Sequence, residues 1–400
     1  MPIGFLKYKF IDPLKEFIED SRAIGITLLI CTALSLVLAN STWAISYQHF
    51  WHTELPWHTP MLPHSLEHFI NDGLMAVFFL LAGLEIKSEL IKGELSSLQK
   101  SILPIGGAIG GMAMPAIFFI VFNVGTTYVN GWAIPTATDI AFSLGVASLL
   151  GNRVPIALKI FLTALAIIDD LGAIVVIALF YGGALKWLFL IAALAITALL
   201  YFVNQKMRGF SILQVLLGIS IWFCMYNSGI HATVAGVLVA FTVPVKQIHR
   251  LELQLHNWVY FLIMPVFALA NTAITINTSN LMQDLTNPLS LGIIVGLVVG
   301  KPVGIMLVSY ILVKAKIAQL PTNTRWMHMI GAGMLAGIGF TMSIFIATLA
   351  FSDVLLQNQS KLAVLTASIF AIILGYLWLS RSGSSSTTAT EEASSSASAS

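Results

Sequence analysis

The segment from Thr163 to Val176 reads TALAIIDDLGAIVV and carries two adjacent acids in an apolar setting. Asp169 and Asp170 lie near the middle of an apolar run that extends from 155 to 182. A run of this length is typical of a helix that crosses a lipid bilayer. Ionisable groups are costly inside hydrocarbon, so the pair indicates a functional site within a membrane-spanning helix.

The whole 400-residue chain shares this apolar character. Hydrophobic residues make up 57% and charged residues 10% of the sequence, and the mean hydropathy is +0.88, whereas about a quarter of residues are charged in soluble proteins. The net charge of +2 is too small and too dispersed for a nucleic-acid surface. The two cysteines lie in apolar runs and provide neither a disulfide framework nor a metal site. The composition predicts a membrane protein without a sizeable soluble domain.

Twelve apolar segments have about the length of a membrane helix. They cover residues 23–40, 67–88, 102–125, 131–150, 155–182, 187–204, 210–225, 229–244, 257–275, 289–313, 327–351 and 360–380. The short seventh and eighth segments leave eleven spans as an alternative. With twelve spans, 17 of the 20 basic residues fall on one side, Lys186 and Lys361 fall on the other, and Lys301 lies within the tenth span. Because Lys and Arg collect on the cytoplasmic side, this asymmetry favours twelve spans with both termini in the cytoplasm.

Three regions flank or interrupt the spans of the predicted transmembrane domain, 23–380. Residues 1–22 form a cytoplasmic N-terminus without a signal-peptide pattern. Residues 41–66 lack Lys and Arg but contain several Trp and His, which is typical either of an external loop at the lipid headgroups or of a dimer contact. Residues 382–400 are a low-complexity Ser, Ala and Thr tail that we expect to be disordered and cytoplasmic.

The fourth and eleventh segments are each interrupted near the middle by sequence that is poor in helix formers. Residues 134–139 read IPTATD, and residues 337–341 read GIGFT, with glycines at Gly337 and Gly339. Segments 3–5 and 10–12 are seven spans apart, an odd number, so any structural correspondence between them must be inverted across the membrane. The sequence therefore predicts an all-α polytopic protein with two inverted repeats, whose discontinuous helices cross at the midplane and form a site there.

The polar residues in this region suit the exchange of a cation for a proton. Oxygen ligands bind hard cations such as Na⁺, and a buried carboxylate beside a like charge binds either a proton or a metal ion. Asp169 and Asp170 are the candidate ligands, with the Thr138 hydroxyl as a further oxygen. Lys301 requires an anionic partner in hydrocarbon, and one of the two aspartates is its natural partner. Asp139 either neutralises the positive N-terminal ends of the two half-helices, as Lys301 neutralises their negative C-terminal ends, or caps the second half-helix, and the two roles are compatible.

A second group of titratable residues lies nearer the predicted membrane surfaces. Glu85 and Glu89 are four apart and share one helix face. With Glu252 and His256 they form either an ion funnel and pH-sensitive cluster or a solvated helix end. Asp72 opens the second segment, and His231 is either a packed histidine or a proton relay.

Four motifs together resemble the bacterial NhaA-type sodium/proton antiporter family. They are TDIAF at 138–142, AIIDDLGA at 166–173, GKPVG at 300–304 and LAGIGFTMS at 335–343. The resemblance extends from about Asn71 to Phe351. It departs from the family pattern at Ser88, where a basic residue is common between the two glutamates.

The resemblance implies an inner-membrane Na⁺(Li⁺)/H⁺ antiporter, not an enzyme, that works without a cofactor. By position, Asp170 would bind the cation and Asp169 would pair with Lys301 in the ion-free state. The pH response would map onto Glu85, Glu89 and Glu252, with His231 and His256 nearby, and the family's dimerisation through the first external loop predicts a homodimer. A sodium-coupled symporter for an organic solute is the alternative, and its larger polar cavity would need Asn, Gln or Arg residues that are scarce here.

Overall fold

The protein is all-helical in the computed structural model, which describes residues 21–57, 59–206, 211–276 and 279–382. The helices are α3 (Ser21–Ala39), α4 (Ala44–Trp51), α5 (Leu66–Phe69), η2 (Ile70–Leu74), α6 (Met75–Ile91), η3 (Glu94–Ser96), α7 (Leu98–Asn123), η4 (Thr127–Thr136), α8 (Ile140–Leu149), η5 (Gly151–Arg153), α9 (Ile156–Phe180), α10 (Trp187–Lys206), α11 (Ile212–Ser228), α12 (Val234–Thr242), α13 (Val245–Trp258), η6 (Val259–Ile263), α14 (Met264–Asn271), α15 (Leu281–Thr286), α16 (Pro288–Val295), η7 (Gly296–Gly300), α17 (Lys301–Lys314), α18 (Trp326–Ala336), α19 (Phe340–Ala350) and α20 (Val354–Ser382). Two of the predicted regions lie mostly outside the described residues. These are residues 1–20 of the predicted N-terminus, 1–22, and residues 383–400 of the predicted tail, 382–400.

Each of the twelve predicted segments overlaps at least one helix. In the described ranges, seven helices are long and apolar enough to cross a membrane, and the pair α18 and α19, bent by 45°, makes an eighth candidate. The seventh and eighth segments are separate helices, because α11 ends at Gly229, whose φ of +91° favours glycine. The two short segments are thus two helices, α11 and α12, and not one continuous helix.

Two predicted boundaries differ from the structure. The ninth segment begins at Val245 instead of 257, because the polar stretch that precedes the apolar run is also helical and continues through a π-helical turn, η6, into α14. Hydropathy detects apolar length, and α13 is too polar to be detected in that way. The predicted loop 41–66 contains a two-turn helix, α4, and an isolated antiparallel bridge between Glu54 and Ser65.

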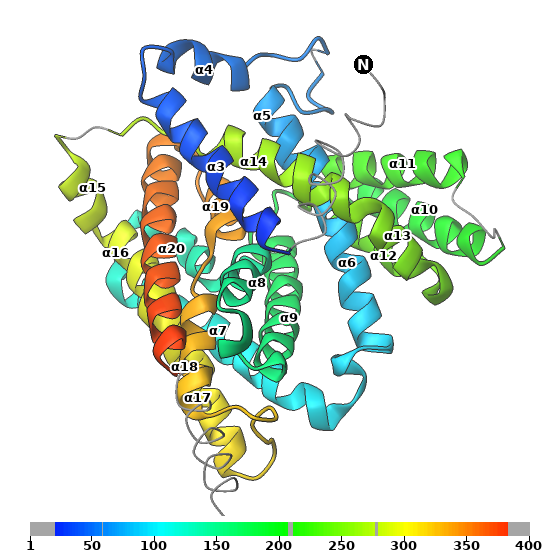
Figure 1. Cartoon of the computed structure of the whole chain (residues 1–400). Coiled ribbons are helices and arrows are strands. Elements are labelled where there is room, and N and C mark those ends of the chain that lie inside the picture. Colours follow the sequence, from blue (N-terminus) through cyan, green and yellow to red (C-terminus); the bar gives the residue numbers. More distant parts are fainter. Residues whose placement is uncertain (1–20, 58, 207–210, 277–278, 383–400) are drawn as a thin grey trace, which may run out of the picture.

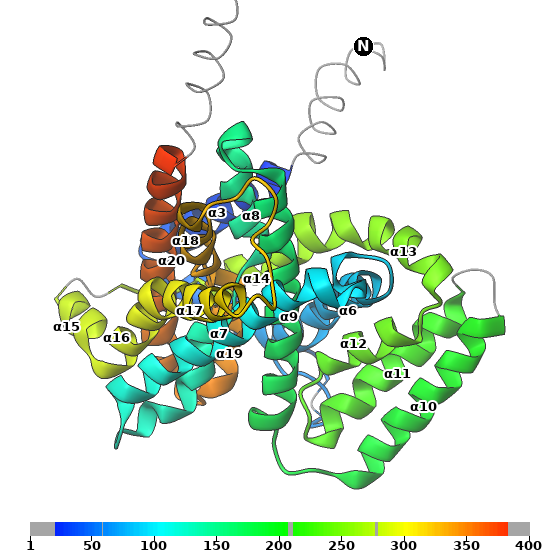
Figure 2. The same cartoon turned by 90° about the horizontal axis from the view of Figure 1, so that it is seen from below.

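The helices form two groups that meet along the centre of the molecule (Figures 1 and 2). In the first group α7 packs against α9, α16 and α17, and α20 packs against α16, α18 and α19. In the second group α12 packs against α6, α10 and α11, and α13 against α6. Figure 2 shows α10–α12 on the opposite side of α9 from α15–α20. The groups meet where α6 of the second group packs against α9 of the first.

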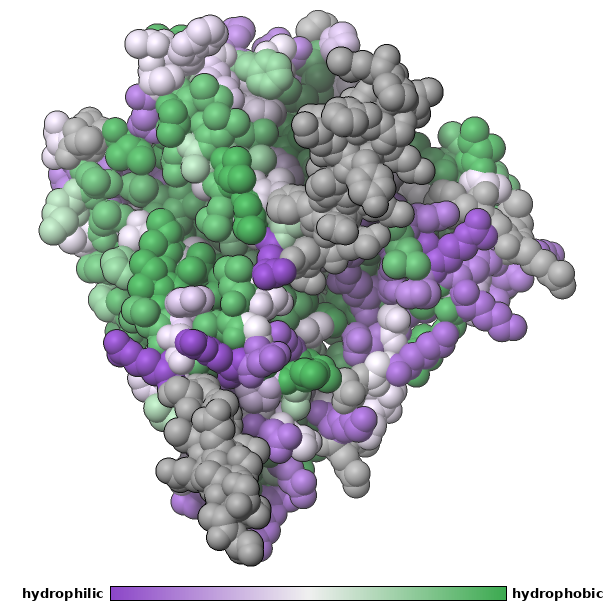
Figure 3. Space-filling view, viewed as in Figure 1, coloured by the Kyte–Doolittle hydropathy of each residue, from purple (hydrophilic) through white to green (hydrophobic). Residues whose placement is uncertain are grey.

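The outer surface of the bundle is apolar. Ile30 on α3 and Ile369 on α20 are 61% and 56% exposed, as are many other large hydrophobic side chains along these helices. Figure 3 shows green apolar side chains over α3 and α20, whereas purple hydrophilic ones gather toward the lower end and the right of the same face. An apolar belt of this kind is what a bilayer covers.

The two interrupted segments cross at the centre of the bundle and run antiparallel there. The Asp139 amide donates to the Ile338 carbonyl at 2.6 Å. The hydroxyl of Ser143 donates to the Leu335 carbonyl at 2.8 Å, and the hydroxyl of Ser343 donates to the Ile134 carbonyl at 2.7 Å. These last two bonds are reciprocal, since each serine lies in the second half-helix of one segment and bonds to the first half of the other. Such reciprocity is expected of two inverted repeats related by an approximate two-fold axis.

Candidate functional site

The side chain of Asp139 caps the N-terminal ends of two half-helices. Its Oδ1 accepts the Phe142 amide at 3.2 Å, which caps α8. Its Oδ2 accepts the Thr341 amide at 3.1 Å and the Thr341 hydroxyl, in the first turn of α19. Helix N-termini carry partial positive charge and unpaired amides, so one buried carboxylate serves both. The capping role and the charge-compensating role predicted for Asp139 are therefore found in the same side chain.

Asp169 lies beside this crossing and forms a buried ion pair with Lys301. The Lys301 Nζ is 2.6 Å from the Asp169 Oδ2, and both side chains are fully buried. Lys301 also donates to the Thr136 carbonyl at the C-terminal end of η4, where the half-helix carries partial negative charge. The Thr138 hydroxyl lies 2.6 Å from the same Asp169 oxygen and 3.0 Å from the Ala336 carbonyl.

Lys301 reaches this position because of the backbone before it. The π-helical turn η7, Gly296–Gly300, ends directly before Lys301, and a Cβ at Gly300 would lie 3.0 Å from the Pro115 Cα on α7. The π-helical turn η7 and α7 therefore approach each other closely here. The extra residue in the π-helical turn changes the direction in which the following side chains, including Lys301, project. The same crowding holds at the second break, where a Cβ at Gly337 would lie 2.5 Å from the Leu297 carbonyl oxygen.

Asp170 differs from its neighbour, because none of the described residues forms an ion pair with it. Its side chain is 6% exposed, and its Oδ1 has no hydrogen-bond partner among the described residues. The Oδ1 of Asp169 is likewise without a partner there. Burying a carboxylate oxygen without a partner is costly unless a proton or a cation neutralises the group. The adjacent aspartates thus present carboxylate oxygens that suit either a proton or a hard cation.

A cavity of about 380 Å³ extends along the face of α9 that carries Asp170. Thr163 and Ile167 line it, and these residues precede Asp170 by seven and three positions, so all three share one helix face. We name it the inner cavity, after the predicted cytoplasmic side. Its charged and titratable lining residues are Glu85, Glu89, His249, Glu252, His256 and Tyr260.

The inner cavity brings together four of the five residues predicted for the pH response. Glu85, Glu89, Glu252 and His256 line it, and His249 joins them 3.9 Å from Glu252. Sequence reasoning missed His249 and Tyr260. His249 lies on α13 and Tyr260 on η6. Their place on the helix face that lines the cavity can be predicted only if the polar stretch of α13 is known to be helical.

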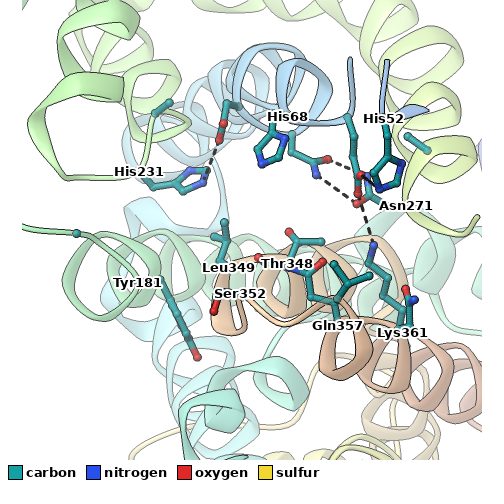
Figure 4. A pocket seen from close by; sticks show the side chains of 18 of the residues that line it. His52, His68, Tyr181, His231, Asn271, Thr348, Leu349, Ser352, Gln357 and Lys361 are labelled. Atoms are coloured by element: carbon teal, nitrogen blue, oxygen red, sulfur yellow. Dashed lines mark hydrogen bonds and ion pairs between the residues drawn. The ribbon is translucent and has the colours of Figure 1, made fainter. Parts of the chain in front are cut away.

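His231 is not part of this cluster, which corrects the expectation that it lies near the glutamates. Its Nε2 is 3.2 Å from the Asp72 Oδ1, in a separate cavity of about 670 Å³. Asp72 lies in η2, before the start of α6, whereas Glu89 lies near its end, so about 25 Å of helix separates them. We name this second space the outer cavity (Figure 4).

The structure also places residues at the crossing that the sequence did not single out. Thr341 bonds to Asp139, and Thr136 and Ala336 contribute carbonyls to Lys301 and Thr138. In the outer cavity, Lys361 and Glu67 approach each other. A single sequence carries no signal for these pairs, because each joins segments far apart in the chain.

Comparisons with known proteins agree with this geometry. The family model described as Na⁺/H⁺ antiporter 1 matches residues 15–379. The chain is 44% identical over 381 residues to a Na⁺/H⁺ antiporter NhaA 2 of Clostridium beijerinckii, covering 92% of this chain and 94% of that protein. It is 50% identical over 375 residues to a Na⁺/H⁺ antiporter NhaA of Dechloromonas aromatica, covering 91% and 95%. A Na⁺/H⁺ antiporter NhaA of Flavobacterium psychrophilum is 48% identical over 372 residues, covering 91% and 95%.

These matches confirm the resemblance carried by the four motifs, and they extend it to nearly the whole chain. The helices, the crossing and the apolar surface agree with a multi-pass bacterial membrane protein of the transporter class. The chain belongs to the Na⁺/H⁺ antiporter 1 family.

Proposed function

We propose that this protein is a secondary active transporter that expels Na⁺ or Li⁺ from the cytoplasm in exchange for external protons. The observation that carries the proposal is Asp170, a buried carboxylate whose Oδ1 has no hydrogen-bond partner in the part of the chain that the structure describes, next to the Asp169–Lys301 ion pair at the crossing of two broken helices. The relatives named above are Na⁺/H⁺ antiporters, which supports the same ions here. Twelve spans in the inner membrane, with both termini cytoplasmic, agree with the distribution of basic residues.

Competition for the same oxygens explains how one site can exchange the two ions. A sodium ion that passes from the inner cavity to the two aspartates, which lie beyond its lining residues, takes oxygen ligands from Asp170 and Asp169. Binding displaces a proton from Asp170, and it also separates Asp169 from Lys301. If Lys301 then loses its own proton, two protons leave for each Na⁺ bound, and the exchange carries net charge. Thr138 already contacts Asp169, so its hydroxyl is placed to take part in the rearrangement.

Alternating access requires the site to face each cavity in turn. The first helix group holds the crossing, Asp169, Asp170 and Lys301, and the second group holds the glutamates of α6 and α13. Rocking of one group against the other would close the inner cavity and connect the site with the outer one. The clustered acids Glu85, Glu89 and Glu252 also make the inner cavity sensitive to pH, since protonation relieves their mutual repulsion.

A sodium-coupled symporter of similar fold is not favoured. The inner cavity, on the Asp170 face of α9, holds about 380 Å³ and has no Asn, Gln or Arg among its lining residues; the amide side chains of Gln48, Asn71, Asn271, Gln357 and Asn358 line the outer cavity instead. The named relatives are all antiporters.

The proposal is tested with inside-out membrane vesicles that carry a respiratory proton gradient. Addition of NaCl or LiCl should collapse the gradient, whereas KCl and choline chloride should not. Asp170→Asn should abolish the response, because the amide neither exchanges a proton nor supplies an anionic ligand. Asp353→Asn is the matched control, since Asp353 is exposed at the start of α20 and Asn also caps a helix. No cation response at any pH, or a full response in Asp170→Asn, would overturn the proposal.

A further inference from the structure

Tyr260 lies at the end of the inner cavity that is nearest to the paired aspartates. It lines the cavity together with Glu85, and both side chains interact electrostatically with Asp170. Asp170 itself lies beyond the lining residues. A cation that moves from the inner cavity to Asp170 therefore comes close to the Tyr260 side chain.

The hydroxyl of Tyr260 is a polar group in a buried side chain. Tyr260 is 7% exposed, and no group in the described ranges forms a hydrogen bond with its hydroxyl. The hydroxyl of a buried tyrosine usually has a hydrogen-bond partner. Because Tyr260 lines the inner cavity, the contents of that cavity are what its hydroxyl can bind.

The backbone around Tyr260 directs its side chain into the cavity. Tyr260 is the second residue of the π-helical turn η6, which lies between α13 and α14. A π-helical turn changes the direction of the side chains and is frequent at functional sites, and Lys301 directly follows another such turn, η7. The His256 ring lies 4.7 Å from the Tyr260 ring, centroid to centroid, and η6 packs against α6, which carries Glu85. These contacts hold the phenol at the end of the cavity.

Three carboxylates from three helices surround this position. Glu85 on α6, Asp139 at the start of α8 and Asp170 on α9 all act electrostatically on Tyr260. A phenol oxygen has a lone pair for a cation, and it adds an oxygen ligand without adding a further negative charge. Hard cations bind several oxygen ligands of this mixed kind, carboxylate and neutral. The Tyr260 hydroxyl therefore suits a cation that the neighbouring carboxylates attract.

Building on the proposed function, we propose that the Tyr260 hydroxyl is an oxygen ligand of the transported cation at the end of the inner cavity, where the ion exchanges part of its hydration shell before it reaches Asp170. The phenol oxygen replaces one water ligand, and the carboxylates of Glu85 and Asp170 balance the charge of the ion. The role of Tyr260 concerns the cation and not the exchanged proton, which stays with Asp170.

Tyr260→Phe tests this inference, because it removes the hydroxyl and keeps the ring beside His256. In inside-out vesicles, the half-saturating Na⁺ concentration should rise by about tenfold, since an interaction with a charged group is lost. The maximal rate should stay within about twofold of the wild type, as expected when a binding interaction alone is removed. Tyr376→Phe is the matched control, since Tyr376 is 42% exposed on α20 and lines neither cavity; it should change neither value.

A second measurement does not depend on the transport rate. Fluorotyrosine in place of Tyr260 reports on the phenol of the purified protein by ¹⁹F NMR. Its resonance should shift on addition of NaCl and not of choline chloride, whereas fluorotyrosine in place of Tyr376 should show no shift.

Three results would each overturn the inference while Na⁺ exchange itself is present. They are an unchanged half-saturating Na⁺ concentration in Tyr260→Phe, a lower maximal rate of that variant without a change in the half-saturating concentration, and a ¹⁹F resonance at position 260 that does not respond to Na⁺. A wild type without any Na⁺-dependent exchange would instead overturn the proposed function.

Discussion

Removing either member of the Asp169–Lys301 pair alone should destabilise the protein. Removing both should lower the free energy of unfolding by less than the sum of the two single losses. Both side chains are fully buried, and the Lys301 Nζ lies 2.6 Å from the Asp169 Oδ2. Loss of one partner from a buried ion pair costs about 3–5 kcal/mol, because an unpaired charge remains in a low-dielectric setting. Loss of both partners removes the charges together.

The contacts that remain after each substitution determine how much the free energy of unfolding falls. Without Asp169, Lys301 keeps only the Thr136 carbonyl as an acceptor among the described residues. Without Lys301, Asp169 keeps the Thr138 hydroxyl. Neither neutral group compensates a full charge, so we expect Asp169→Asn and Lys301→Gln each to lower the free energy of unfolding by about 3 kcal/mol or more. The double variant should lose less than the sum of the two, by about 2–3 kcal/mol.

The assay is denaturant unfolding of the purified protein in detergent, followed by the fluorescence of its nine tryptophans. The wild type, both single variants and the double variant complete the cycle, and the exposed Asp353→Asn and Lys186→Gln variants serve as controls that should unfold like the wild type. Additive costs, within about 0.5 kcal/mol, would show that the two charges are not coupled. That result would refute the ion pair as the resting arrangement of the site.

Three further predictions concern the crossing and the inner cavity. Asp139→Ala should lower the free energy of unfolding by about 2–4 kcal/mol, because α8 and α19 both lose their cap. Asp139→Asn should lower it by less. Equal losses for Asp139→Ala and Asp139→Asn in the same unfolding assay would contradict the argument that one side chain caps both helices. Gly337→Ala should cost about 1–3 kcal/mol because its Cβ would lie 2.5 Å from the Leu297 carbonyl oxygen, and wild-type stability would show that the break is not tightly packed. At alkaline pH, where Glu85 is ionised, Glu85→Gln should raise the half-saturating Na⁺ concentration at the inner face, and added choline chloride should shrink this difference through screening; a difference that does not change with ionic strength would argue against electrostatic attraction.

Much of the fold could be predicted because its physical causes are local. The run around Asp169 and Asp170 predicted a helix over 155–182, and α9 spans Ile156–Phe180. The stretches at 134–139 and 337–341, which are poor in helix formers, predicted two discontinuous helices. The structure shows a break in the α-helix at both places. Apolar length and helix breakers act over a few residues, so a single sequence reveals them.

The pairing of side chains could be predicted only in part. Lys301 in hydrocarbon demands an anion, which limits its partner to a few aspartates. The bonds of Asp139 to Thr341 and of Lys361 to Glu67 depend on which segments lie side by side, and no local signal fixes this. His231 was placed with the wrong cluster for the same reason, because its position relative to the two ends of α6 is set by tertiary packing. The predicted homodimer stays a prediction.

The most direct test of the central claim is the proton release that accompanies Na⁺ binding to the purified protein. The protein is held in a weakly buffered detergent solution with a pH indicator, and NaCl is added against a choline chloride control. If Na⁺ and H⁺ compete for the carboxylates of Asp169 and Asp170, Na⁺ should release protons from the wild type and release none from Asp170→Asn. Binding of Na⁺ without proton release, or equal release from Asp170→Asn, would contradict the account.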